Sequence, residues 1–369
     1  MNRRSFLIRS GLMMLTVGGG TMLFRSLNEL KTVARQAAAL GVDGMDGDHA
    51  AILYFASLAP SGHNTQPWTV RILNENHWIL GTAASRWLPG IDPDNREMLI
   101  SLGAFLENLI LAARQYGYAV KSQLIAENSK DKVIMDITFT KGFVSGAIDC
   151  SNIELRRTIR SSLLSKVLAP EDIDLVLGEH KATWFYFTQQ SAAGKYLAVK
   201  TLEANKIQTY KEAAQSELAK WIRWSNRDIM KFRNGLTAET MEVEGFSRWY
   251  VKNFYSEKSV LTDDFRQATL EKIKEQIAAG SGWLLITSPT SPQELIDLGR
   301  KLERMWLTLR DHKIAIHPMN QLIEEVPFKQ AAAEKLEMKY ELQLLLRVGY
   351  VDSYPMPVSP RMASQTILL

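Results

Sequence analysis

The chain has 369 residues, of which 46% are hydrophobic and 23% are charged, values typical of a folded globular protein. A mean hydropathy of -0.13 argues against a polytopic membrane protein. The 44 basic residues nearly balance the 40 acidic ones and exceed them locally only at the N-terminus, so we expect no nucleic-acid partner. The single cysteine, Cys150, excludes an internal disulfide, and no histidine or cysteine spacing indicates a metal site.

Residues 1–40 have the pattern of an export signal. A basic start is followed at residues 11–24 by an apolar stretch, which is shorter than the roughly 20 residues of a spanning helix. The pattern Arg3-Arg4-x-Phe-Leu resembles the twin-arginine signal, which is read by a receptor. We therefore expect export by the twin-arginine machinery to the periplasm or cell envelope. An uncleaved anchor and a buried first helix are the alternatives.

In the first half, hydrophobic periodicity predicts two helices and three strands. Residues 49–58 are expected to form a short helix, and residues 68–73 and 77–82 a β-hairpin. Apolar residues at three- and four-residue spacing predict a helix over 95–117, and alternating apolar residues predict a strand over 133–139.

In the second half, a helix is expected from about residue 151, and long polar helices over about 191–279. The remaining elements are strands at 183–188, 283–287 and 340–351 and a helix at 292–312. The helical block 200–265 has no counterpart in the first half. It is either an elaboration of the surface or a lid over a site.

Two helical segments repeat at a constant offset of 297 − 101 = 196 residues. Residues 101–109 (SLGAFLENL) align with residues 297–305 (DLGRKLERM), so that Leu, Gly, Leu and Glu recur at matching places. Each copy follows a predicted strand of similar sequence, which begins with Trp78 or Trp283. The repeat favours two related half-domains over a chance match between two amphipathic helices.

The segment 59–68 (APSGHNTQPW) carries the most specific pattern. Pro60 and Gly62 predict a turn, and this turn brings together the hydrogen-bonding side chains of Ser61, Asn64 and Gln66. Short donors and acceptors with close backbone approach suit a flat heteroaromatic ligand with polar edges, such as a flavin. An ordinary polar loop before a strand is the alternative.

Two further segments are basic. On the predicted helix, Arg156 and Arg160 lie one turn apart on the same face, with Thr158 between them. Two guanidiniums and a hydroxyl suit a phosphate dianion, and a solvated basic face is the alternative. Residues 357–361 (PVSPR) predict a rigid turn that presents Ser359 and Arg361.

Together these segments resemble the nitroreductase-like FMN-binding superfamily, over most of residues 49–369 apart from 200–265. In that family an Arg-x-Ser-x-Arg/Lys helix and a C-terminal basic residue hold the FMN phosphate, while an Ala-Pro-Ser turn of the other subunit contacts the flavin. The resemblance implies FMN as the cofactor. It places Arg156, Thr158 and Arg361 at the phosphate, Arg160 toward the ribityl chain or pyrimidine, and Ser61 and Asn64 at the flavin. The matching turn residues Pro60, Gly62, Gln66 and Ser359 complete the expected cofactor-binding set.

The chain departs from the family in how its motifs are distributed. The first half has the Ala-Pro-Ser turn without the Arg helix, and the second half has the Arg motif without the turn. The resemblance thus implies an α+β, nitroreductase-like fold of two half-domains, 48–150 and 151–369, fused as an intramolecular pseudo-dimer with one composite FMN site. A monomer would then suffice for the site. This arrangement, the N-terminus, residues 88–97 (LPGIDPDNRE) and the ending 347–361 are similar to the Acg-type branch, whose members carry a lid over the flavin.

Two functions follow from this resemblance. The first is FMN-dependent two-electron reduction of a nitroaromatic, quinone or similar small acceptor, in which the flavin performs the redox chemistry and no side chain is assigned a catalytic role. The second is storage or shielding of FMN under a lid, with little or no activity toward NAD(P)H. His63 is expected to be a turn residue rather than a catalyst.

Overall fold

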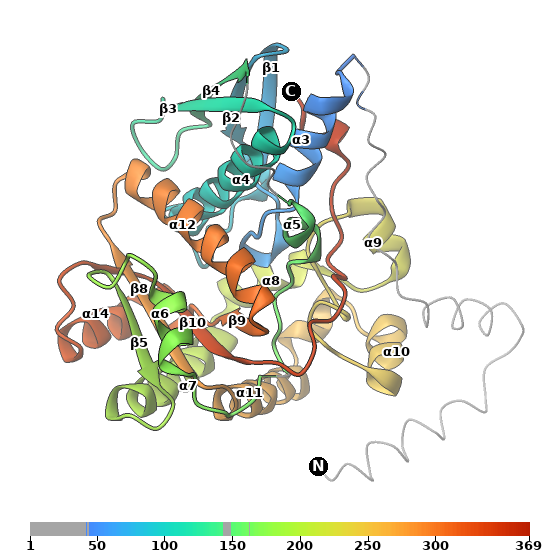
Figure 1. Cartoon of the computed structure of the whole chain (residues 1–369). Helices are drawn as coiled ribbons and strands as arrows, with labels where there is room; N and C mark the ends of the chain where they lie inside the picture. Colours follow the sequence, from blue (N-terminus) through green and yellow to red (C-terminus); the bar gives the residue numbers. More distant parts are fainter. Residues whose placement is uncertain (1–41, 43, 143–148, 162) are drawn as a thin grey trace, which may run out of the picture.

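Two four-stranded antiparallel sheets, with the helices α4 and α12 between them, organise the molecule (Figure 1). The computed structural model describes residues 42–369 except 43, 143–148 and 162. The predicted export signal therefore lies outside the described residues. The α+β class expected from the sequence is confirmed.

The first sheet has the strand order β1-β2-β4-β3, and the second has the order β5-β8-β10-β9. All neighbouring strands in both sheets run antiparallel. The strands are β1 (Trp68–Asn74), β2 (His77–Thr82), β3 (Tyr118–Leu124), β4 (Val133–Lys141), β5 (Trp184–Thr188), β8 (Gly282–Ser288), β9 (Ile314–Pro318) and β10 (Glu341–Tyr350).

The elements follow one another in the same order in both halves. A helix, two strands, a helix and two strands occur as α3-β1-β2-α4-β3-β4 and again as α6-β5-β8-α12-β9-β10, with further helices inserted in the second series. The helices of this frame are α3 (Gly47–Ser57), α4 (Arg96–Gln115), α6 (Pro170–Leu177) and α12 (Pro292–Asp311). Corresponding strands also hold corresponding places in the two sheets.

Helices α4 and α12 cross at a pair of glycines. A Cβ on Gly103 would lie 2.0 Å from the carbonyl oxygen of Ile296, and a Cβ on Gly299 would lie 2.0 Å from that of Ile100. The contact is therefore reciprocal, because Gly299 and Ile296 lie 196 residues after Gly103 and Ile100, the offset of the repeat. Only glycine lets the two backbones approach this closely.

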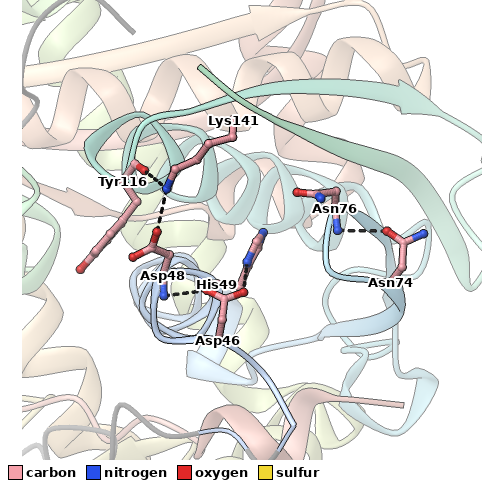
Figure 2. A network of polar contacts seen from close by, with 7 residues as sticks. All are labelled: Asp46, Asp48, His49, Asn74, Asn76, Tyr116 and Lys141. Atoms are coloured by element: carbon pink, nitrogen blue, oxygen red, sulfur yellow. Dashed lines mark hydrogen bonds and ion pairs between the residues drawn. The ribbon is translucent and has the colours of Figure 1, made fainter. Parts of the chain in front are cut away.

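The first two strands of the two sheets are joined in different ways. In the first sheet, a tight turn after Asn74 connects β1 to β2, and Asn76 N–H donates to Asn74 Oδ1 at 3.0 Å (Figure 2). In the second sheet, residues 189–281 separate β5 from β8. This insertion contains α7 (Ala192–Tyr210), α8 (Glu212–Trp221), β6 (Ile222–Arg223), α9 (Asn226–Phe232), β7 (Leu236–Thr237), α10 (Gly245–Phe254), η4 (Glu257–Leu261) and α11 (Asp263–Ala278).

Polar contacts fasten α3 to the first sheet (Figure 2). Asp46 caps the helix by accepting hydrogen bonds from the N–H groups of Asp48 and His49 at 2.9 and 3.1 Å. Lys141, at the end of β4, donates to Asp48 Oδ2 at 2.9 Å and to the carbonyl oxygen of Tyr116 at 3.1 Å. These contacts hold the helix that leads directly into the predicted ligand-binding turn.

The second sheet is buried on both faces. In β8, Leu284 and Ile286 face the central core that contains α4 and α12, while Trp283 and Leu285 face a second core formed with α7, α11, α13 (Gln321–Glu324) and α14 (Val326–Lys335). Successive side chains of a strand point to opposite faces, so an uninterrupted apolar strand indicates two covered faces.

The C-terminal segment crosses from the second sheet to the first. After β10 the chain runs to η5 (Ser364–Ile367), and its end lies beside α3 and β1 (Figure 1). Leu368 forms a parallel β-bridge with Val70, and Leu369 N–H donates to the Val70 carbonyl at 3.0 Å. The segment that carries Ser359 and Arg361 is thus held at both ends.

The predicted hairpin, the helices at 95–117 and 292–312 and the strands at 133–139, 183–188, 283–287 and 340–351 are confirmed within a few residues. The short strands β3 and β9 were not predicted. The expected long helices of 191–279 are interrupted by the β6-α9-β7 unit. Within the described parts of the chain, no helix is both long and apolar enough to cross a membrane.

Candidate functional site

The turn between α3 and β1 has an unusual backbone. His63, Asn64 and Gln66 have φ values of 46°, 54° and 53°, in the left-handed region that favours glycine. Ser61 Oγ accepts a hydrogen bond from Gln66 N–H at 3.0 Å and so closes the turn. Non-glycine residues in this region cost of order 1–3 kcal/mol each, and they cluster at ligand-binding sites.

The side chains of Asn64 and Gln66 hold two distant segments against this turn. One is the 233–243 segment of the insertion, and the other is the C-terminal segment. Asn64 Nδ2 donates to the carbonyl oxygens of Gly235 and Pro360, both at 3.1 Å. Gln66 Nε2 donates to the carbonyl of Arg233 at 3.0 Å, and its Oε1 accepts from the N–H of Met362 at 2.9 Å.

Residues 156–160 do not continue a helix, so the predicted helix through Arg156 and Arg160 is wrong. The helix α5 (Ser151–Leu155) ends before them, and Arg156 has an extended backbone with φ −61° and ψ 135°. The β-branched Thr158 and Ile159 that follow disfavour a helix. The Arg156 side chain also has strong partners in the core.

Arg156 is buried, with 4% of its surface exposed, so a solvated basic face is excluded for it. Its Nε lies 3.1 Å from Glu303 Oε1 on α12, and its guanidinium lies 5.0 Å from the centre of a Trp306 ring. Its Nη2 donates to the carbonyl oxygen of Leu58 at 2.7 Å. Burial raises the pKa of Glu303, and the charge of Arg156 opposes that rise. The ion pair with Glu303 holds Arg156 within the second half, and the hydrogen bond to Leu58 joins that half to the start of the turn.

Arg361 reaches the same carbonyl oxygen from the C-terminal segment. Its Nη2 donates to the Leu58 carbonyl at 3.0 Å, and its Nη1 donates to Asn64 Oδ1 at 2.7 Å. The structure therefore brings together the three segments singled out in the sequence: the Ala-Pro-Ser turn, Arg156 and Arg361. Of the other expected residues, Pro60, Thr158 and Ser359 are half-buried on these segments.

Buried cations and imidazoles form a chain that reaches His63 of the turn through Arg160. Arg347 on β10 is fully buried, and its guanidinium donates to the carbonyl of Arg160 and lies 3.3 Å from His317 Nδ1. Burial and the charge of Arg160 together lower the pKa of His63 to about 4. Burial also places the pKa of His317 well below its usual value, with help from Arg347 and Arg160. At neutral pH both imidazoles are neutral, and the positive charge resides on the arginines.

Sequence reasoning did not assign Arg347, His317 or Glu242 to the site. Arg347 had a usable signal, because it is the only charged residue between Leu342 and Val348 in an otherwise largely apolar strand. A buried charge is costly without a partner or a function. Glu242 offered no comparable signal, because its partners, described below, are backbone N–H groups about 80 residues away.

A small hollow lies beside Gly62, near the start of α4. Its volume is about 10 Å³, close to the minimum that holds one water molecule, so it is not a pocket for a flavin. Burial and the neighbouring Glu97 together raise the pKa of Asp92 in its wall to about 6. The lining residues are Gly62, Thr65, Pro67, Arg86, Trp87, Leu88, Asp92, Glu97, Met98 and Ser101.

No protein-family model matches this chain. The chain is similar to the "Probable NAD(P)H nitroreductase PigM" of a Serratia species, with 24% identity over 332 residues, which is 85% of this chain and 90% of that protein. It is also 34% identical over 70 residues to a "Putative NAD(P)H nitroreductase" found in two strains of Mycobacterium tuberculosis, matching 19% of this chain and 20% of those proteins. These similarities support an oxidoreductase of the nitroreductase type, a class that generally uses a flavin.

Proposed function

We propose that this chain is an FMN-dependent oxidoreductase of the nitroreductase type, with one FMN per chain in a composite site between two fused half-domains. One observation carries the proposal: Arg156 of the second half and Arg361 of the C-terminal segment meet the turn of the first half at the carbonyl of Leu58. The shared strand order of the two sheets and the reciprocal contact of Gly103 and Gly299 support the fusion.

The residues beside the turn fit a polar, phosphate-bearing flavin. Among the described residues, Nε and Nη1 of Arg347 and Nδ1 of His63 are buried and have no hydrogen-bond partner. Buried polar atoms without partners are costly, so such atoms point to an absent group that would satisfy them. The heteroatoms and phosphate oxygens of FMN would satisfy the two arginine donors, and its ribityl hydroxyls could donate to the imidazole nitrogen.

The chain's own residues would bind and orient the cofactor. When bound, the flavin supplies the hydride chemistry. Thr158 and Arg361 would bind the phosphate, while Arg156 would position the Leu58 carbonyl and Arg361 through its ion pair with Glu303. Arg160 would place positive charge beside His63 of the turn, and Arg347 would add positive charge behind Arg160, which favours a negatively charged ligand. We assign no side chain the role of a general acid or base. The acceptor would be a nitroaromatic, a quinone or a similar small molecule.

The test compares FMN with riboflavin, which lacks the phosphate. Removing one charged partner of a phosphate costs about 1.5–3 kcal/mol, so Arg361→Ala should weaken FMN binding roughly ten- to a hundred-fold and weaken riboflavin binding far less. The exposed Arg71 on β1 provides the control, since Arg71→Ala should affect neither ligand. Titration followed by flavin fluorescence measures both affinities. Equal losses for both ligands, two FMN per wild-type chain, or no FMN binding at all would refute the proposal.

FMN storage is the second candidate, and one observation favours it. The 233–243 segment contacts Asn64, Gln66 and the backbone of Arg160, so part of the 200–265 block lies against two of the three segments proposed to bind the flavin. We propose that this block acts as a lid. Anaerobic mixing of the FMN-loaded protein with NADH and NADPH separates the two functions. Rapid bleaching of the flavin absorbance supports the enzyme, and persistent oxidised flavin supports storage.

We also propose export to the periplasm or cell envelope by the twin-arginine machinery, on the basis of Arg3 and Arg4. Replacing both arginines by lysine should retain the protein in the cytoplasm, as measured by cell fractionation, whereas unchanged export would reject the signal. We further propose that the monomer suffices for the flavin site. In that case FMN affinity should not depend on protein concentration across the range in which dimers would form.

A further inference from the structure

The carboxylate of Glu242 is bound like a ligand by the backbone of the second half. Its two oxygens accept hydrogen bonds from the N–H groups of Arg160 and Ser161, at 3.1 and 2.7 Å respectively. Each oxygen therefore takes one of two consecutive backbone donors. Successive N–H groups of this kind form a concave anion site, here built from the segment that follows Thr158.

One guanidinium group pairs with this carboxylate, and two more lie within electrostatic reach of it. Arg157 Nη2 lies 3.6 Å from Glu242 Oε1, and the Arg160 side chain donates to the carbonyl of Thr240 at 2.7 Å. Burial lowers the pKa of Arg347 to about 10, and the charge of Glu242 opposes this shift, so the two groups lie within electrostatic reach. Glu242 thus brings a negative charge to a buried region rich in positive charge.

Glu242 reaches this position at a cost. Its φ of 57° lies in the left-handed region, which strains a non-glycine residue, and its side chain is only 8% exposed. A surface residue of a connecting loop does not require either feature. The contacts with Arg157, Arg160 and Ser161 offset this cost, which indicates a site that selects a carboxylate.

We propose that the N–H groups of Arg160 and Ser161, together with Arg157, form a binding site for a small organic carboxylate, and that Glu242 is its built-in competitor. The side chain already in place indicates the ligand class, because a planar group with two oxygens and one negative charge matches two adjacent N–H donors. Binding of the ligand would displace Glu242 and release the 233–243 segment from this site. The proposal does not depend on a flavin being bound.

The experiment measures benzoate binding to the full chain by calorimetry. A carboxylate tethered by a short loop acts at an effective concentration of order mM, so Glu242→Ala should tighten benzoate binding by about ten-fold or more. Glu242→Gln keeps the volume and removes the charge, and it should give a smaller gain. Glu244, an exposed neighbour on the same loop, provides the control, and Glu244→Ala should leave the affinity unchanged. A benzoate affinity that is the same in all three variants and the wild type would overturn the proposal.

Hydrogen exchange at single amides tests the site directly. Glu242→Ala should speed exchange of the Arg160 and Ser161 amides by about ten-fold or more, and saturating benzoate should restore their protection. Fast exchange that benzoate does not slow would overturn the proposal. If Glu242→Ala does not fold, the same measurement on Glu242→Gln decides it.

Inorganic phosphate and FMN serve as comparison ligands. Phosphate should bind the Glu242→Ala protein more weakly than benzoate, and tighter phosphate binding would overturn the assignment to carboxylates. FMN titration of the same sample reports on the proposed function separately. Benzoate protection without FMN binding would support the carboxylate site and refute the flavin, whereas FMN binding without benzoate protection would do the reverse.

Discussion

The two halves of this molecule share one strand order, but they differ in how their first two strands are connected and in how the glutamate on each central helix is paired. A two-residue turn joins β1 to β2, whereas residues 189–281 separate the corresponding β5 and β8. Glu107 on α4 and Glu303 on α12 occupy matching places of the repeat, and both are fully buried. Glu107 pairs with Arg300 and Arg304, whose side chains are 30% and 61% exposed, while Glu303 pairs with the buried Arg156.

This difference shows which end of the repeated arrangement carries the candidate site. At one end, a glutamate meets arginines that also reach solvent, so that ion pair lies at the edge of the core. At the other end, the corresponding Glu303 holds Arg156, which donates to the carbonyl of Leu58 beside Arg361 and the strained turn. The inserted residues 233–243 cover this second end. The frame is therefore symmetric in its topology, and the candidate site occupies one side of it.

The largest expected effect comes from neutralising the two glutamates separately. Glu303→Gln leaves Arg156 buried without a counter-charge, which should lower the free energy of unfolding by about 3–5 kcal/mol. Glu107→Gln should cost about 1 kcal/mol or less, because Arg300 and Arg304 can turn toward water. Urea unfolding at neutral pH measures both values. Equal losses would mean that the two ends are equivalent.

The next effect concerns the helix crossing, which the structure makes symmetric. Gly103→Ala and Gly299→Ala each place a Cβ 2.0 Å from a backbone carbonyl oxygen, so each should lower the free energy of unfolding by about 1–3 kcal/mol or more, and by similar amounts. Gly47 at the start of α3 has open space around it, and Gly47→Ala is the control with little expected change. Thermal unfolding measures the three variants. A large loss at one crossing glycine only would contradict the reciprocal contact.

A smaller effect concerns how stability depends on pH through Glu324, a carboxyl near Glu97 in the first turn of α4. Burial and the neighbouring Glu97 raise the pKa of Glu324 on α13 to about 8, so in the native state this carboxyl keeps its proton while the unfolded chain loses it. Stability should therefore fall as the pH rises from about 4.5 to about 8. Glu324→Gln should remove this part of the decline and so be more stable than wild type near pH 8. Urea unfolding at several pH values measures it, and an unchanged slope in the variant would reject the raised pKa.

The smallest effect has the opposite sign and concerns the turn. Burial lowers the pKa of His63 to about 4, so between pH 4 and 6.5 the unfolded chain binds a proton that the native state does not. Stability should therefore rise with pH in this window, and this contribution is lost as the pH falls. His63→Asn suits the measurement, because asparagine tolerates the left-handed φ of 46°. A variant whose stability varies with pH as steeply as that of wild type would show that His63 does not titrate in this range.

Part of the site could be predicted from sequence because its signals are local. The turn at Pro60 and Gly62, the hairpin after Asn74 and the periodic helices each depend on neighbouring residues. The predicted helix through Arg156 and Arg160 was wrong for a related reason. Helical spacing was a plausible reading of five residues, but the partners of Arg156 are Glu303 and Leu58, which lie far away in the chain.

By itself, the sequence determined the α+β class, the repeat at an offset of 196 residues and the identity of the turn residues, since hydrophobic period and turn chemistry act over a few positions. Only the tertiary structure decided that Arg156 forms a buried ion pair with Glu303, that Arg347 contacts His317 and the Arg160 carbonyl, and that Glu242 binds the backbone of Arg160. Contacts of this kind join residues from about 30 to more than 140 positions apart, and their strength comes from desolvation, which depends on how the whole chain packs.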